Sequence, residues 1–226
     1  MRILSANRSD GRYALSLVPE SVSDPNPPHR DLLIDATLGG LSGDRLAAAG
    51  ALAFGSYLRG VFSTEKPVSP RMAGALAEFA SPRLVSPSNI SIDGTQFTGS
   101  GTTLVLDTEH AGLLGRNALD RSQVLALDIL PMTEWTGRLF SMDRLVVASN
   151  ANLLTSHRED RAKVGPFLAV AVAFAHELHV SRIVLPVPVA DPDAWTDRAT
   201  TLLAATGIDL IIVAQSELRH LDLVED

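Results

Sequence analysis

The chain has 226 residues, of which 46% are hydrophobic and 20% charged, so it can bury a sizeable core, and wholesale disorder is excluded. The net charge of −7, from 19 Lys and Arg against 26 Asp and Glu, argues against sequence-independent binding of nucleic acid, which needs a cationic surface. Cysteine is absent, which excludes disulfides, thiolate nucleophiles and cysteine-ligated metal sites.

The first 97 residues predict a small α+β region that opens with a β-hairpin. Met1–Ser5 and Arg12–Val18 are β-prone, and Asp10-Gly11 between them is a turn signal. Ser21–His29 contains three prolines and predicts a connector, and Asp31–Ala36 is a short apolar run that fits a strand or the start of a helix.

Two helices and a strand are predicted in the rest of this region. Ser42 is a candidate N-cap for an Ala- and Leu-rich helix from Arg45 to about Leu58. Val61–Ser63 is a candidate strand. Ser69-Pro70, with serine at the N-cap and proline in the first turn, predicts a second helix that ends near Phe79.

Strands and helices alternate from residue 98 to the end of the chain. This alternation predicts βαβ units, and therefore a Rossmann-like, mostly parallel sheet with helices on both faces. We place the boundary between an N-terminal region (1–97) and a Rossmann-like domain (98–226) in the Gly/Ser/Thr-rich loop. The expected strands are Thr102–Leu106, Gln123–Leu130, Leu145–Ala148, Arg182–Val187 and Ile208–Val213, and the expected helices begin at Gly165-Pro166 and Asp191-Pro192.

Polar residues follow or end several of these strands, and they are the candidate site residues. In a parallel sheet the carboxyl ends of the strands face one edge, where ligands bind. Carboxylates beside a histidine suit acid–base chemistry if the site is dry. The alternative is that these residues only terminate strands in polar loops. The candidate catalytic residues are Asp107, Glu109, His110 and Asp128, and the candidate ligand-binding residues are Asn150 and Asn152.

A cationic segment just before the Gly165-Pro166 helix start is a candidate anion-binding element. Arg158, Arg161 and Lys163 would act together with the free amides of the helix to hold a phosphate or carboxylate. The intervening Glu159-Asp160 pair offsets part of that charge, and a solvated charged loop is the alternative.

The sequence assigns no metal site and gives the tryptophans no binding role. His176 and His179 are spaced like part of a zinc helix, but no third ligand is evident. Trp135 and Trp195 are isolated aromatics without interleaved basic residues, so we expect ordinary packing rather than nucleic-acid stacking.

The order of several segments resembles the PP-loop proteins of the adenine-nucleotide α-hydrolase-like (HUP) superfamily, which includes 7-cyano-7-deazaguanine synthase. The similar segments are Gly39-Gly40-Leu41-Ser42-Gly43-Asp44-Arg45-Leu46, Pro67-Val68-Ser69-Pro70 and the strand–loop–helix–strand pattern of Val146–Val184. The resemblance implies a Rossmann-like nucleotide domain that activates a carboxylate or related oxygen with ATP and releases pyrophosphate.

The phosphate-binding motif of that family is missing here. Where the family has Ser-Gly-Gly-x-Asp-Ser after the first strand of the nucleotide domain, this chain has Asp107-Thr108-Glu109-His110-Ala111-Gly112. Carboxylates beside a triphosphate cost about 1 kcal/mol per unit pair at about 4 Å in water, and more when partly buried. Bound Mg²⁺ would reverse that sign, because carboxylates are its preferred ligands. Without the metal we expect ATP pyrophosphatase activity to be lost.

Two functions follow as hypotheses. The first is a degenerate PP-loop-like protein that binds a small anionic or nucleotide ligand, or else a partner subunit or a second copy of itself. The second is an active enzyme with a rebuilt site, which carries out either ATP- and Mg²⁺-dependent carboxylate activation or acid–base chemistry. This enzyme would use Asp107, Glu109, His110, Asp128 and Arg161. No cofactor is assigned, and ATP with Mg²⁺ is the combination to test. No apolar run is long enough to span a bilayer and no signal peptide is visible, so we expect a cytoplasmic protein that binds neither nucleic acid nor membrane.

Overall fold

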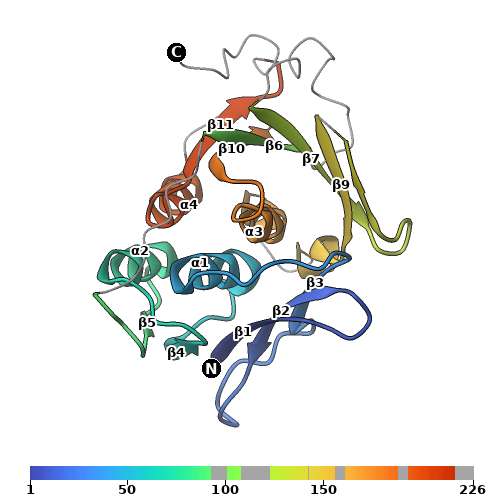
Figure 1. Cartoon of the computed structure of the whole chain (residues 1–226). Coiled ribbons are helices and arrows are strands. Elements are labelled where there is room, and N and C mark those ends of the chain that lie inside the picture. Colours follow the sequence, from blue (N-terminus) through green and yellow to red (C-terminus); the bar gives the residue numbers. More distant parts are fainter. Residues whose placement is uncertain (93–100, 108–122, 142, 156–160, 188–192, 217–226) are drawn as a thin grey trace.

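The computed structural model describes residues 1–92, 101–107, 123–141, 143–155, 161–187 and 193–216 (Figure 1). Within these residues, eleven strands form one mixed, mostly parallel sheet, so the chain is an α/β protein. The strands are β1 (Arg2–Asn7), β2 (Tyr13–Val18), β3 (Asp31–Ile34), β4 (Gly60–Thr64), β5 (Val85–Pro87), β6 (Thr102–Asp107), β7 (Val124–Pro131), β8 (Arg138–Phe140), β9 (Arg144–Ser149), β10 (Val180–Val187) and β11 (Asp209–Ala214). The helices are α1 (Gly43–Phe54), α2 (Pro70–Ala80), α3 (Gly165–Phe174) and α4 (Ala194–Ala204), with short 3-10 helices η1 (Ala151–Thr155) and η2 (Arg161–Val164).

The described chain consists of two halves with the same order of elements. The first half runs β1-β2-β3-α1-β4-α2-β5, and the second runs β6-β7-β9-α3-β10-α4-β11, with β8 added between β7 and β9. The strands lie side by side in the order β3-β2-β1-β4-β5 in one half and β9-β7-β6-β10-β11 in the other. The halves differ in one strand, because β2 is antiparallel to both neighbours whereas β7 is parallel to both of its neighbours. The predicted boundary at residues 97 and 98 stays a prediction, and the sheet continues across it.

Corresponding strands of the two halves other than β2 and β7, such as β3 and β9, point in opposite directions in the sheet. The halves meet where β3 pairs antiparallel with β9 through Ile34 and Ser149. The side chain of Asn150 strengthens this junction, since its Oδ1 accepts from the amide of Leu33 at 2.7 Å and its Nδ2 donates to the carbonyl of Asp31 at 3.0 Å. As a result, the carboxyl ends of β6, β7, β9, β10 and β11 lie at one edge of the sheet, and those of β1, β3, β4 and β5 lie at the opposite edge. We call the former edge the second-half carboxyl edge.

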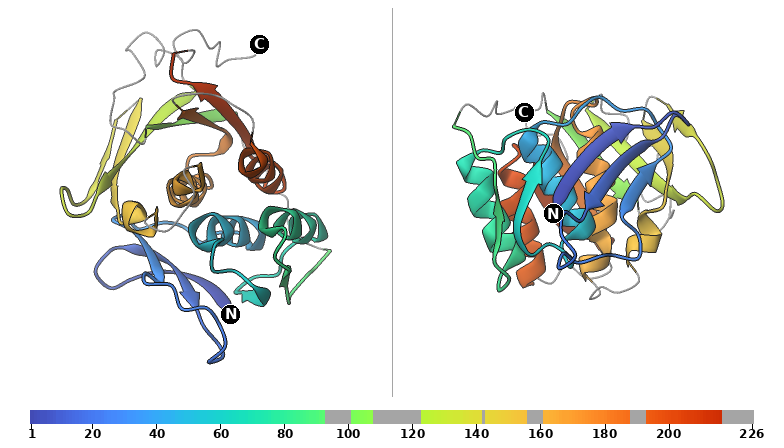
Figure 2. Two further views of the ribbon diagram at one scale, coloured as in Figure 1. Left: turned by 180° about the vertical axis from the view of Figure 1, so that it is seen from behind. Right: turned by 90° about the horizontal axis from the view of Figure 1, so that it is seen from below.

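All four described helices lie on the concave side of the sheet, which curves around them (Figures 1 and 2). The helices α1 and α3 pack together at the centre, and α2 packs against α4. The sequence predicted helices on both faces, and among the described elements the outer face carries none. The central strands are nevertheless buried on both faces, because Leu104 and Leu106 join the helix-side core while Val105, which points the other way, is also buried.

Helices α1 and α2 begin at their predicted N-cap residues, whereas α4 does not. Ser42 Oγ accepts from the amide of Arg45 at 3.3 Å, and Ser69 Oγ accepts from the amide of Met72 at 3.1 Å, as serine N-caps do. The N-cap of α4 is Asp193, whose Oδ1 accepts from the amide of Thr196 at 2.7 Å, and not the predicted Asp191-Pro192, which lies outside the described residues. No described helix has the length and hydropathy that a membrane span requires.

Tyr13 places a phenol in the core of the first half and makes stability depend on pH. Its side chain is buried, and burial raises its pKa to about 12. To a smaller extent, Ser5 lowers this pKa and the negative charge of Glu65 raises it. Because the folded state favours the neutral phenol, its contribution to stability is complete below the unfolded pKa of about 10 and is lost as the pH rises toward 12.

We therefore expect Tyr13→Phe to remove about 2–3 kcal/mol of the alkaline loss of stability between about pH 9 and pH 12. The measurement is the free energy of unfolding by urea across that range for both proteins. Parallel stability curves for wild type and variant would contradict the assignment.

Candidate anion-binding pocket

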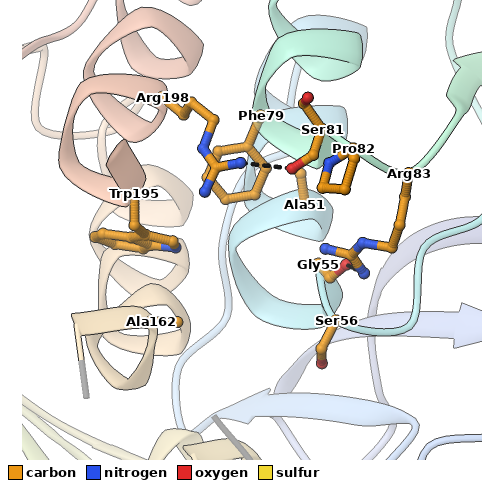
Figure 3. A pocket seen from close by; sticks show the side chains of 10 residues that line it. All are labelled: Ala51, Gly55, Ser56, Phe79, Ser81, Pro82, Arg83, Ala162, Trp195 and Arg198. Carbon is orange, nitrogen blue, oxygen red and sulfur yellow. Dashed lines mark hydrogen bonds between the residues drawn. The ribbon is translucent and has the colours of Figure 1, made fainter. Parts of the chain in front are cut away.

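A pocket of about 490 Å³ opens between the ends of four helical elements (Figure 3). Its walls come from the C-terminal ends of α1 and α2, the first turns of α4, and η2. The lining residues are Ala51, Gly55, Ser56, Phe79, Ser81, Pro82, Arg83, Ala162, Trp195 and Arg198.

The topology explains why these four elements meet. Helices α1 and α2 each return to the amino end of a first-half strand, and that end lies at the second-half carboxyl edge because the halves run in opposite directions. Helix α4 starts after the carboxyl end of β10, and η2 starts after that of β9. The pocket therefore lies at the edge where the sequence predicted a site, on the side of the sheet that carries the helices.

Two arginines on the pocket wall are held by carbonyl groups at helix ends. Arg83 Nη1 donates to the carbonyl of Gly55, which follows α1. Arg198 Nη1 donates to the carbonyl of Ser81 at 2.5 Å, and its Nε donates to the carbonyl of Ala194 at 2.8 Å. A guanidinium has five N–H groups. The bonds described here thus fix the position of each cation and use only part of its donor capacity.

An aromatic wall stands beside these cations. The rings of Phe79 and Trp195 meet edge to face, with centroids 6.3 Å apart and planes at 64°. Trp195 and Arg198 are three residues apart on α4, so they share one face of that helix. Figure 3 shows the nitrogen-bearing edge of the Trp195 indole turned toward the side on which Gly55 and Arg83 lie. An apolar surface and hydrogen-bond donors therefore face the same space.

The electrostatics of the pocket favour an anion. The pKa of Arg83 is lowered, first by burial and then by the positive charges of Arg59 and Arg198. Among the described residues that line the pocket none is acidic, although the whole chain carries a net charge of −7. A bound anion would offset the mutual repulsion of these cations, because opposite charges within a few ångströms stabilise the charged form.

Asp128 is placed away from the pocket. Leu127 and Ile129 belong to the helix-side core, so Asp128 between them faces the outer side of the sheet. It is nearly buried and forms a salt bridge with Arg144. The register pairs Asp128 with Asp107 on the neighbouring strand. Asp128 and Asp107 are thus neighbours in the sheet, but Asp128 does not point toward the pocket.

The other predicted residues divide between structural positions and the pocket margin. Asn150 bonds to the backbone of β3, at the junction of the halves, and Asn152 is exposed on η1. Ala162 lines the pocket, and its neighbour Lys163 is exposed on η2. Arg161 is in η2, but its side chain lies outside the described part of the structure. Glu109, His110 and Arg158 also lie outside the described residues.

Sequence reasoning missed the three residues that give the pocket its chemistry. Arg83 follows a helix end and carried no signal. Trp195 was expected to pack in the ordinary way, and it does pack against Phe79 and the core, but its place in the pocket wall was not predicted. Only the spacing of Trp195 and Arg198 on one predicted helix carried a signal, because it places an aromatic ring and a cation on the same face.

No family model, curated protein or solved structure matches this chain.

Proposed function

We propose that this protein binds a small anionic ligand in the pocket between α1, α2, η2 and α4. The observation that carries the proposal is the pair of guanidinium groups, Arg83 and Arg198, in a pocket whose described lining contains no acidic residue. A pocket of this volume is within the range that small-molecule sites occupy. The described lining also lacks the acid–base pair or activated nucleophile that catalysis needs.

A purely structural role for the arginines is the competing explanation. Cations do hydrogen-bond the terminal carbonyl groups of helices, as Arg83 and Arg198 do here. That role accounts for one arginine at each of the two helix ends. It gives no reason for the two arginines and an aromatic pair to surround the same open space. Their combination with a cavity supports ligand binding in addition to capping.

The strand order supports the proposal that the second half is a Rossmann-like unit. The order β9-β7-β6-β10-β11, all parallel, corresponds to 3-2-1-4-5 of a doubly wound sheet, in which ligands bind at the carboxyl ends near the reversal of strand order. Here the strand order reverses between β6 and β10. The carboxyl ends of these strands lie at the second-half carboxyl edge, as the pocket does. We retain as a proposal that this unit is a PP-loop relative whose ATP pyrophosphatase activity is lost.

Arg198→Gln is expected to weaken the binding of inorganic phosphate or benzoate about tenfold or more, because a hydrogen bond to a charged group contributes about 1.5–3 kcal/mol. Isothermal titration calorimetry measures the affinity. Arg71→Gln is the matched control, since Arg71 is exposed on α2, outside the pocket lining, and its replacement removes the same charge. Equal affinities in wild type and both variants, or no binding at all, would refute the proposal.

The rebuilt-site enzyme remains a second hypothesis, favoured by the pairing of Asp107 with Asp128 in neighbouring parallel strands. If the rebuilt site activates a carboxylate rather than carrying out acid–base chemistry alone, ATP is expected to turn over in the presence of Mg²⁺ with release of pyrophosphate. Calorimetry with ATP, with and without Mg²⁺, combined with a pyrophosphate assay, separates it from a binding protein. If alanine replacements of Asp107, Glu109 and His110 leave a measured activity unchanged, the hypothesis fails.

A further inference from the structure

The pocket wall combines an aromatic ring, from Trp195, with a positively charged group, from Arg198, and both come from helix α4. The ring of Trp195 and the guanidinium of Arg198 lie on one face of α4, one turn apart, so their Cβ atoms are about 5–6 Å from each other. Arg83 contributes a second guanidinium from the far side of Ser81 and Pro82 (Figure 3). A ligand that uses all three groups has a planar ring and a negatively charged group only a few bonds apart.

The number of cations distinguishes between kinds of anion. Arg83 and Arg198 both line the pocket, so two positive charges are available to a ligand there. A carboxylate carries one negative charge and two acceptor oxygens, which one guanidinium fork can satisfy. A phosphate monoester carries about −1.5 to −2 charges at pH 7 and three terminal oxygens, enough to accept from two guanidinium groups. The arginine pair therefore matches a phosphate monoester better than a carboxylate.

We propose that the pocket is selective for a phosphate monoester attached to an aromatic ring, with the ring against Trp195 and the phosphate between Arg83 and Arg198. This inference rests on the proposed function and specifies its ligand. Ring stacking on an aromatic side chain and bidentate contacts from arginine are independent contributions, so both halves of such a ligand add to the affinity.

The test uses phenyl phosphate, inorganic phosphate and benzoate as probes of the full-length protein. Phenyl phosphate is expected to bind about tenfold more tightly than either of the other two, because each lacks one of the recognised groups. In a Trp135→Phe background Trp195 is the remaining tryptophan of the chain, so its fluorescence reports directly on the ring-binding wall. We expect phenyl phosphate to change this fluorescence more strongly than inorganic phosphate does.

Trp195→Leu separates the ring contact from the phosphate contact. We expect this variant to lose the tenfold preference for phenyl phosphate while its affinity for inorganic phosphate stays within about twofold of wild type. Fluorescence in the Trp135→Phe background gives an independent reading if Trp195→Leu does not fold. Benzoate binding as tightly as phenyl phosphate would overturn the phosphate selectivity and leave anion binding intact. Failure of all three probes to bind would overturn both proposals.

Discussion

Gly43→Ala is expected to lower the free energy of unfolding by about 2–4 kcal/mol. A Cβ at this position would lie 1.9 Å from the carbonyl oxygen of Pro67 and 2.7 Å from its carbonyl carbon, so the backbone itself would have to move. That movement is opposed on both sides. Lys66 Nζ donates to the carbonyl of Leu41 at 2.7 Å, and Asp44 Oδ1 accepts from the amide of Ser69 at 2.7 Å.

Gly74→Ala is the matched control for this prediction. Gly74 is exposed within α2, and a Cβ there meets nothing within 4 Å. Alanine in place of glycine at an open helical position is expected to raise stability by about 0.5–1 kcal/mol. Urea denaturation followed by far-UV circular dichroism measures both variants. A Gly43→Ala protein as stable as wild type would show that α1 and the 66–69 segment are not held as closely as described.

Phe174→Ala is expected to destabilise the protein by about 3–5 kcal/mol, through lost burial and the cavity left behind. Phe174 is fully buried at the end of α3, the helix that packs against α1 where the two halves meet. Because that interface is shared, we expect the halves to unfold together in one cooperative transition with an unchanged denaturant slope.

Leu139→Ala is the control for Phe174→Ala, because it truncates an apolar side chain on the surface instead of in the core. Leu139 is 59% exposed on β8, so its truncation is expected to change stability by less than about 0.5 kcal/mol. Chemical denaturation followed by near-UV and far-UV circular dichroism tests cooperativity. Two separate transitions in Phe174→Ala would indicate that the halves are more independent than the packing of α1 against α3 implies.

Local sequence signals predicted most elements of the fold. Ser42 and Ser69 mark the starts of α1 and α2 because an N-cap depends on a few neighbouring residues. The apolar runs at 102–106 and 123–130 predicted two strands, and their parallel pairing is confirmed. The strand β8 was missed, since its three residues are all exposed and lack a buried, alternating pattern. The placement of the helices on the concave face was missed as well, because no local signal specifies which face a helix covers.

The candidate site could be predicted only as an edge of the sheet. The carboxyl-end rule depends on strand direction, which the alternation of strands and helices reveals. Which side chains meet there depends on how the halves pack, and Arg83 and Arg198 are separated by more than a hundred positions in the chain. Asp128 showed the limit of this reasoning, since one step along a strand decides which face a side chain occupies.

The antiparallel meeting of β3 and β9 also determines which loops lie away from the pocket. The turn between β1 and β2, with Gly11 at a φ of 83°, lies at the edge opposite the pocket, as do the connections that follow β3 and β4. A fluorescent label, an affinity tag or a short insertion in the 8–11 turn would therefore report on this protein without obstructing its ligand. Surface immobilisation through that turn leaves the arginine-lined opening exposed to solvent.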